Sequence, residues 1–282
     1  MNNSNSLNGF HKSRFYLLIS FLAIFGFVLI GKLIYLQFYS NTEGLGIVPD
    51  TLVKNVVLEP SRGDIYAANG NILAIGAPYS DTNGHRSGCV RVYSFDGESW
   101  NQIGQDILGE YEEDFGWSVS LNVDGTSLAI GGPQSDVNDY SEAGVVRVYN
   151  FSGDLWSQVG QDINGEWGTS QSGFSVSIDS DGNTIAIGSP YNDGEYVGAT
   201  AGYNCGSTSV YSYDGGLWNQ IGQDIDGEAE GDLSGWSVSL SSDGSALAIG
   251  APYNAGVGAP WNVGLRTGSV RVYKLISNLW VQ

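Results

Sequence analysis

A repeat with a period of about 60 residues constrains this chain more than any other feature of its sequence. The pattern LAIGAP at Leu73 returns as LAIGGP at Leu128, IAIGSP at Ile185 and LAIGAP at Leu247, at spacings of 55, 57 and 62 residues. In a repeat fold, each unit buries its apolar face against its neighbours. One supersecondary unit, used about four times, must therefore account for most of the chain.

Each repeat divides into four short runs in which apolar and polar residues alternate, a pattern typical of half-buried strands. In the unit that begins at Gly116 the runs read SVSL, LAIG, VRVY and WSQVGQDI, with the turn signal VDG between the first two. The glycine of such a turn favours a hairpin because it tolerates positive φ. The 41 glycines and the low charged fraction of 15% agree with short strands and tight turns. We predict an all-β fold, a β-propeller of about four four-stranded blades.

Aromatic residues recur at three fixed places in the repeat: before the first run, at the end of the third and at the start of the fourth. Large rings at equivalent positions predict packing inside the blades. We therefore expect the blade core to contain Trp117, Phe174, Trp236, Tyr93, Tyr149, Tyr211, Tyr273, Trp100, Trp156, Trp218 and Trp280.

The stretch SVSLSSDGSALAIGAP, from Ser237 to Pro252, resembles the FG-GAP repeat, the propeller blade of integrin α-chains and of many bacterial surface proteins. The resemblance extends over residues 73–282. It implies adhesion or the binding of other macromolecules, and such propellers commonly have seven blades. Since the sequence stops soon after Trp280, in the middle of a predicted strand, the four units form either a small propeller or part of a larger one.

Blades of the integrin type often hold calcium in a DxDxDGxxD loop, because Ca²⁺ takes six to eight oxygen ligands. The corresponding loops here begin at Asn122, Asp179 and Ser241, and each is one residue short of the position of the closing carboxylate. Only Asp179 with Asp181 offers two acids, so these two residues are the one candidate calcium site. An ordinary hairpin turn is the alternative, and no other cofactor is expected.

The unequal lengths of the connections indicate which face of the blades binds a ligand. The turns on one face are tight, whereas the second-to-third loops and the links between units, which share the other face, are long and variable. Long loops on a rigid scaffold commonly carry binding residues. We predict ligand contacts there, with solvated polar loops as the alternative, from Tyr79, Asp81, Asp136, Tyr191, Asp193, Glu195, Tyr253 and Trp261, and cation ligands from Glu112, Asp114, Glu230 and Asp232.

An uncharged run of 17 residues, from Phe15 to Gly31, follows a basic leader. With its extension KLIYLQF it is long enough to cross a bilayer core of about 30 Å. Lys12 and Arg14 before it place the N-terminus in the cytoplasm. A cleaved signal peptide is the alternative, although no small-x-small cleavage site follows the run. We predict a cytoplasmic leader (1–14), a single transmembrane helix (15–38), an extracytoplasmic linker (39–61) and an exported propeller (62–282) with units at 62–109, 110–165, 166–227 and 228–282.

The segment VVLEPSRGDIYAANGNILA, from Val56 to Ala74, resembles the start of class B penicillin-binding proteins, in which a membrane span precedes a PxRGxIYDRNGxxLA motif. The resemblance implies an alternative function, as the N-terminal part of a transpeptidase-like protein of the division or elongation machinery. The transpeptidase itself requires a serine three residues before a lysine. After Lys54 the only lysine is Lys274, and Arg271 stands three residues before it, so the catalytic domain is absent.

The charge of the chain narrows the classes of partner. The net charge is −19. Residues 1–73 carry five basic and four acidic side chains, so nearly all the excess acid lies in the repeats. Such a domain repels phosphates, which argues against nucleic acid. His11 and His85 are the only histidines, too few for a multi-histidine metal site, and the chain offers no catalytic constellation. We expect a single-pass protein of the cell membrane, without enzymatic activity, that binds an extracellular protein or glycan.

Overall fold

The structure, a computed structural model, describes residues 64–66, 70–194, 203–254 and 267–282. All of them belong to the compact unit Val56–Gln282. The predicted leader, transmembrane helix and linker lie outside the described residues, as do Glu195 and Trp261. Within the described ranges, no helix is both long enough and apolar enough to span a membrane.

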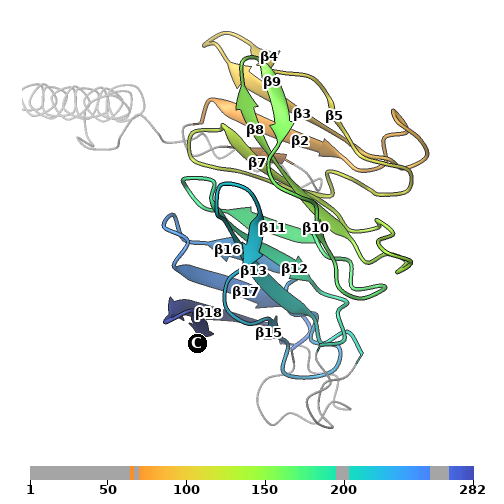
Figure 1. Ribbon diagram of the computed structural model, residues 1–282, viewed down its shortest axis with the longest axis vertical. Coiled ribbons are helices and arrows are strands. Elements are labelled where there is room, and N and C mark those ends of the chain that lie inside the picture. Colours follow the sequence, from red (N-terminus) through yellow and green to blue (C-terminus); the bar gives the residue numbers. More distant parts are fainter. Residues whose placement is uncertain (1–63, 67–69, 195–202, 255–266) are drawn as a thin grey trace, which may run out of the picture. The chain divides into compact units, whose positions relative to one another are not determined.

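Four antiparallel sheets make up the described structure, one in each predicted repeat unit (Figure 1). The first sheet holds β1 (Asp64–Tyr66), β2 (Ile72–Ala77), β3 (Cys89–Phe95), β4 (Trp100–Gln102) and β5 (Ile107–Leu108). The second holds β6 (Ser118–Leu121), β7 (Ser127–Gly132), β8 (Val145–Ser152), β9 (Leu155–Gln158) and β10 (Ile163–Asn164). The third holds β11 (Ser175–Ile178), β12 (Thr184–Ser189), β13 (Ser207–Tyr213), β14 (Trp218–Gln220) and β15 (Ile225–Asp226). The fourth holds β16 (Ser237–Leu240), β17 (Ala246–Ala251), β18 (Ser269–Ile276) and β19 (Leu279–Val281).

The outer strand of the first three sheets is one predicted run in two pieces. In the first sheet, β4 pairs with the end of β3 (Tyr93 with Gln102) and β5 pairs with its start (Cys89 with Leu108). The intervening residues leave the ladder, and Gly104 has a positive φ of 73°. Each sheet thus has the four antiparallel strands of a propeller blade, which confirms the prediction of an all-β fold built from such units.

The end of the segment that resembles penicillin-binding proteins folds as part of the first sheet. Asp64 in β1 stands opposite Ile75 in β2, in the same register that places Val119 opposite Ile130 in the second sheet. The DIY segment therefore occupies the position of the inner strand SVSL, although its side-chain types differ from those of SVSL.

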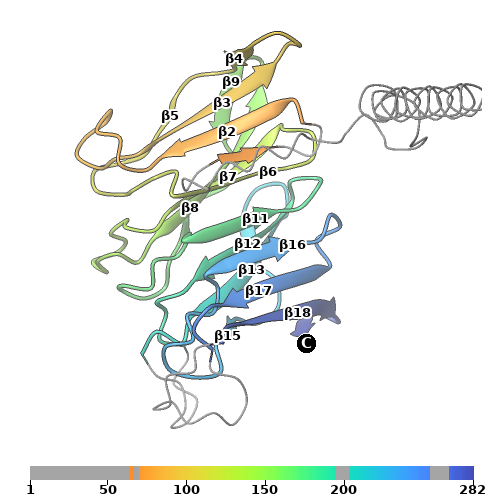
Figure 2. The ribbon, with the colours of Figure 1, turned by 180° about the vertical axis from the view of Figure 1, so that it is seen from behind.

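The core lies between successive sheets, which follow one another in chain order (Figure 2). Val90 and Val92 of the first sheet pack in one cluster with Val119, Leu128 and Ile130 of the second. Two further clusters join the second sheet to the third and the third to the fourth. Burial at these three junctions is the main source of stability, since each sheet alone would expose one apolar face.

A glutamine and a tryptophan connect the outer strands at each junction. The Gln161 side chain accepts a hydrogen bond from the Trp218 backbone N–H (2.9 Å) and donates one to the Trp218 carbonyl (2.8 Å). The indole N–H of Trp218 donates to the Val159 carbonyl at 2.9 Å. Gln105 holds Trp156 in the same way, and Gln223 holds Trp280. The repeated segment IGQD (VGQD in the second sheet) therefore forms the hydrogen-bonding site, here called the receptor, for the tryptophan of the next sheet.

The prediction that all the repeated aromatic residues form blade core is wrong for two groups. Trp100 is 39% exposed, whereas Trp156, Trp218 and Trp280 are 3% exposed. Trp100 belongs to the first sheet, and no described sheet precedes it to supply the IGQD receptor. The second group consists of the rings before the inner strands, which are half-buried and line a groove.

Both cysteines are free and buried; Cys89 begins β3 and Cys205 lies just before β13. Burial raises the pKa of the Cys205 thiol to about 11. Because a pKa raised in the folded state favours the neutral thiol, this contribution to stability is complete below about pH 8.5 and is lost as the pH rises towards 11.

We accordingly predict that neither thiol of the native protein reacts with iodoacetamide at pH 8, because the thiolate is the reactive form. Both should react in concentrated urea. Mass spectrometry after a short pulse of the reagent measures the difference, and rapid labelling of Cys205 in the folded protein would contradict its burial.

Candidate functional site

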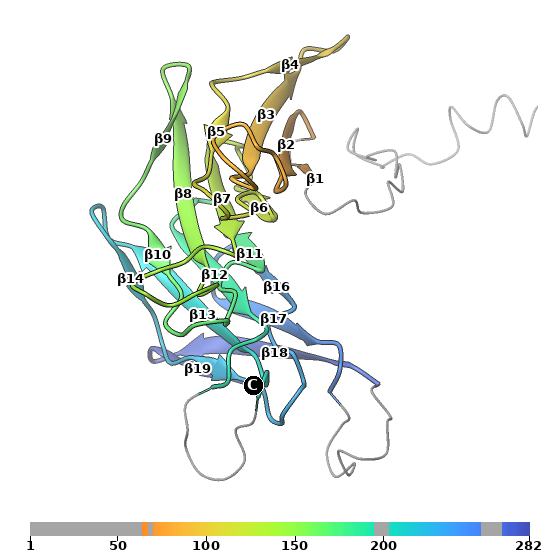
Figure 3. The same cartoon turned by 90° about the vertical axis from the view of Figure 1, so that its right-hand side faces the viewer.

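A row of aromatic rings lies at the start of the inner strands, on the face that carries the long loops. The inner strands β6, β11 and β16 follow one another from sheet to sheet (Figure 3). Each inner strand of the second, third and fourth sheets is preceded by a glycine and an aromatic residue. Because the inner strands of successive sheets are neighbours, Trp117, Phe174 and Trp236 become neighbours too. Their ring centroids are 5.5 Å apart for the first pair and 4.6 Å apart for the second.

Tyrosines from a second position of the repeat extend the row. Tyr79, Tyr191 and Tyr253 each follow the proline after the second strand. The Tyr79 ring meets Trp117 edge to face with centroids 6.3 Å apart, and Tyr253 meets Trp236 at 6.5 Å. We call the six rings together the aromatic row; it comprises Tyr79, Trp117, Phe174, Tyr191, Trp236 and Tyr253.

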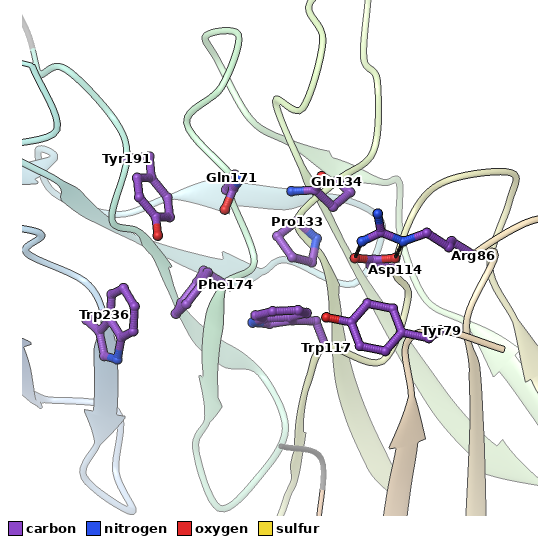
Figure 4. A pocket seen from close by; sticks show the side chains of 10 residues that line it. All are labelled: Tyr79, Arg86, Asp114, Trp117, Pro133, Gln134, Gln171, Phe174, Tyr191 and Trp236. Atoms are coloured by element: carbon purple, nitrogen blue, oxygen red, sulfur yellow. Dashed lines mark hydrogen bonds and ion pairs between the residues drawn. The ribbon is translucent and has the colours of Figure 1, made fainter. Parts of the chain in front are cut away.

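The second sheet departs from this pattern and thereby creates a pocket. Gln134 follows its proline, where the other three sheets have tyrosine. A pocket of about 230 Å³ opens there beside the aromatic row. Figure 4 shows Trp236, Phe174, Trp117 and Tyr79 in a row, with Tyr191, Gln171 and Gln134 above it. The lining consists of Tyr79, Arg86, Asp114, Trp117, Pro133, Gln134, Gln171, Phe174, Tyr191 and Trp236.

An ion pair between Arg86 and Asp114 closes one end of the pocket (Figure 4). Arg86 Nε donates to Asp114 Oδ1 at 2.9 Å, and its Nη2 donates to Oδ2. The guanidinium carbon also lies 5.2 Å from the centroid of the Tyr79 ring. Burial raises the pKa of Asp114 more than Arg86 lowers it. The hydrogen bond to Asp114 raises the pKa of Arg86, so the arginine stays charged and fixes the edge of the pocket.

The long loops and the links between sheets lie side by side, as predicted. Glu112 N donates to His85 O at 2.8 Å, and Asp114 N donates to Arg86 O at 2.9 Å. The same pairing joins Thr169 to Ser141 in the next unit. Backbone hydrogen bonds between segments far apart in sequence therefore hold the loop face in shape.

The structure brings together only some of the predicted ligand contacts. Tyr79, Tyr191 and Tyr253 belong to the aromatic row. The carboxylates of three predicted residues instead accept backbone N–H groups of their own loops: Asp81 from Arg86, Asp136 from Glu142 and Asp193 from Asn204.

The acidic residues predicted as cation ligands have divergent environments. Asp114 is buried in the ion pair with Arg86, and Asp232 is buried where Asn254 Nδ2 donates to it at 2.7 Å. Glu112 and Glu230 are exposed. Among the described residues, no three His, Cys, Asp or Glu side chains gather closely enough to hold a metal ion.

Asp179 and Asp181 lie in the hairpin turn between β11 and β12. Asp179 Oδ1 accepts the backbone N–H groups of Asn183 and Thr184, both at 3.0 Å, and Asp181 Oδ1 accepts that of Asn183. In the second sheet, Asn122 Oδ1 accepts the equivalent pair of N–H groups at 2.9 Å. The turn thus needs one side-chain oxygen at this position, whether from an acid or an amide. Calcium binding here stays a prediction.

We predict that Asp179→Asn changes the free energy of unfolding little, because the amide supplies the same oxygen. Asp179→Ala should cost about 1 kcal/mol, since it removes the acceptor of two partly buried N–H groups. Urea unfolding with and without CaCl₂ measures both effects. A calcium-dependent stabilisation of the wild type that Asp179→Asn abolishes would show instead that the pair is a calcium site.

Comparison with known proteins adds likenesses at the level of the fold. No family model matches the chain, and no curated protein matches it. A solved structure of Kuenenia stuttgartiensis hydrazine synthase is similar, with 16% identity and a TM-score of 0.46 over 84% of this chain. Pseudomonas aeruginosa periplasmic gluconolactonase is similar with 16% identity and a TM-score of 0.48 over 78% of this chain.

The present chain spans only 52% and 56% of those two proteins. Neither likeness bears on what this chain binds. The resemblances to FG-GAP repeats and to penicillin-binding proteins, which no family model supports, stay predictions.

Proposed function

We propose that this protein is a membrane-anchored binding protein whose exported FG-GAP-like blades hold a neutral glycan chain in the pocket beside the aromatic row. The observation that carries the proposal is the pocket itself, where ring surfaces and side-chain amides converge on a rigid sheet junction. Aromatic and polar side chains share this lining, and polar groups that converge beside aromatic surfaces are typical of ligand sites.

A glycan fits the chemistry of this lining better than other ligand classes. Sugar rings present C–H groups on their faces and hydroxyl groups at their edges. The aromatic row offers apolar surfaces for the faces, and Gln134 offers amide donors and an acceptor for the hydroxyls. Gln171 Nε2 already donates to Glu142 Oε2 at 3.2 Å, so Gln171 offers its carbonyl oxygen and one further N–H. The excess acid of the domain disfavours polyanionic chains, so a neutral glycan is the ligand class.

Binding without catalysis is the activity that the lining supports. Asp114 is the one carboxyl group among the ten residues that line the pocket, and Arg86 already engages both of its oxygens. Hydrolysis of a glycosidic bond commonly uses two carboxyl groups on opposite sides of the bond. The alternative role in cell-wall synthesis depends on residues 1–61, outside the described ranges, and also stays a prediction.

A panel of soluble neutral polysaccharides tests the proposal, with the full chain in detergent micelles. Tyr79→Ala should weaken binding about tenfold, which corresponds to about 1.4 kcal/mol for one stacked ring. Tyr111→Ala is the matched control, because Tyr111 is equally exposed on this face but does not line the pocket. Failure to bind any polysaccharide on the panel, or equal losses in both variants, would contradict the proposal. If the pocket bound only protein ligands and no polysaccharide, its ligand would be a protein and not a glycan.

A further inference from the structure

Two large aromatic side chains outside the pocket lie exposed together on the loop face. Trp167, in the link between the second and third sheets, is 55% exposed, and Tyr140, in the long loop of the second sheet, is 45% exposed. Their rings meet edge to face, with centroids 6.4 Å apart. Tryptophan and tyrosine are enriched where proteins bind partners, because a ring buries a large apolar surface on contact. We call this pair the outer platform.

The backbone beneath the outer platform is fixed, although the rings themselves are exposed. Val137 and Tyr140 exchange two backbone hydrogen bonds, of 2.9 and 2.8 Å, which close a small hairpin within the loop. The hydroxyl of the buried Ser170 lies 2.7 Å from the Trp167 carbonyl oxygen and 3.2 Å from that of Ala143, and so ties the link to the loop. Rings held on a rigid backbone lose little conformational entropy when they bind, so this pair is suited to contact a ligand.

The outer platform is continuous with the pocket, because the same loop and the same link build both. Gln171 lines the pocket and donates from Nε2 to Glu142 Oε2 at 3.2 Å. Glu142 is two residues after Tyr140, and Gln171 is four residues after Trp167. Four residues span at most about 14 Å even when fully extended, so only a short length of ligand separates the pocket from the platform.

The walls of the pocket favour this direction for a ligand that is longer than the pocket. The ion pair between Arg86 and Asp114 closes the end that belongs to the first sheet and its link. The amides of Gln134 and Gln171 stand on the side of the second loop and link, which also carry the outer platform. A chain anchored on the aromatic row therefore leaves the pocket past these amides.

On the basis of the proposed function, we propose that the bound glycan extends from the pocket over the outer platform, where its sugar rings stack on Trp167 and Tyr140. The ligand class is then a long oligosaccharide or a polymer and not a short saccharide. The carboxylates of Asp139 and Glu142, close to Tyr140 in sequence, repel an anionic chain and so favour a neutral one. Two contacts on one chain reinforce each other, because the second forms within the same complex at a high effective concentration.

Oligosaccharides of increasing length test the extension, with the full chain in detergent micelles. Isothermal titration uses gluco-, manno- and xylo-oligosaccharides, each from the disaccharide to the octasaccharide. In a series that the wild type binds, affinity should rise towards the longer members. Trp167→Ala should lower the affinity for the octasaccharide about tenfold and leave that for the shortest bound member unchanged, whereas Tyr79→Ala should weaken both.

Two further variants separate stacking from a general disturbance of the loop face. Tyr111→Ala is the matched control, because Tyr111 occupies the repeat position of Trp167 in the first link and is 67% exposed. It should leave the affinities for short and long members unchanged. Trp167→Tyr keeps an aromatic ring and should restore most of the affinity for the octasaccharide.

The outcomes distinguish this inference from the proposed function on which it rests. If Tyr79→Ala weakens binding but Trp167→Ala has no effect at any length, the pocket binds glycan and the outer platform does not. An equal loss from Trp167→Ala at every length would also overturn the extension, since it would indicate a disturbed pocket. If no oligosaccharide binds, the proposed function is wrong and the extension with it. Unchanged affinities together with loss of self-association in Trp167→Ala would assign the platform to a contact between copies of the chain.

Discussion

Replacing Trp218 by alanine should lower the free energy of unfolding by about 3–5 kcal/mol, the range for truncating a large buried aromatic side chain. Its ring is buried in the junction between the second and third sheets, and its indole N–H donates to Val159 O. The change leaves a cavity against Gly160 and an unsatisfied carbonyl group. Trp100→Ala is the comparison at the same repeat position, and it should cost about 1–2 kcal/mol because this side chain is 39% exposed, whereas Trp218 is 3% exposed.

Urea unfolding followed by circular dichroism measures the two changes. The difference between them isolates the contribution of the junction, because both variants lose the same side chain from the same position of the repeat. Equal losses for Trp218→Ala and Trp100→Ala would mean that the receptor formed by Val159, Gly160 and Gln161 contributes nothing to stability.

Gly188→Ala should destabilise the protein by at least 3 kcal/mol, at the upper end of what overpacking costs, because the added methyl group would meet main-chain atoms. Its Cβ would lie 2.0 Å from the Gly235 carbonyl oxygen and 2.4 Å from Ser175 Oγ. Relief requires the third and fourth sheets to separate. Gly250→Ala places a methyl group at the same position of the fourth sheet, where only the Ser237 side chain approaches closely, and that side chain can rotate.

Thermal unfolding of the two glycine variants at low protein concentration distinguishes them. Gly188→Ala should unfold well below the wild type, and Gly250→Ala should lie within a few degrees of it. A Gly188→Ala protein as stable as the wild type would show that the sheets slide past one another at little cost.

The repeat predicted the sheets well because its signals are local. Alternation, the Asp-Gly turn and the position of each glycine are contained within single strands and turns, so the four sheets could be placed from the sequence. The exposure of Trp100 could not be predicted in this way, because the burial of a tryptophan at this position depends on a neighbouring sheet and not on its own strand.

The sequence predicted two rings of the pocket, Tyr79 and Tyr191, as ligand contacts. The other three, Trp117, Phe174 and Trp236, were assigned to the blade core, so the pocket itself was not predicted. The one signal in the sequence was Gln134, which stands where the three other units have a tyrosine.

The roles of the acidic residues were even harder to predict from the sequence. Asp114 becomes part of the pocket wall only because Arg86, 28 residues earlier, lies beside it when the loop and the link pair through their backbones.

The substitution Gln134→Tyr tests most directly whether this pocket binds a glycan. It restores the residue of the other three units and fills the pocket with a ring, while the sheets and their junctions stay unchanged. Isothermal titration with a polysaccharide that the wild type binds should then show at least a tenfold loss of affinity, with an unchanged unfolding temperature. Unchanged affinity in a correctly folded Gln134→Tyr protein would place the ligand elsewhere and contradict the proposed function.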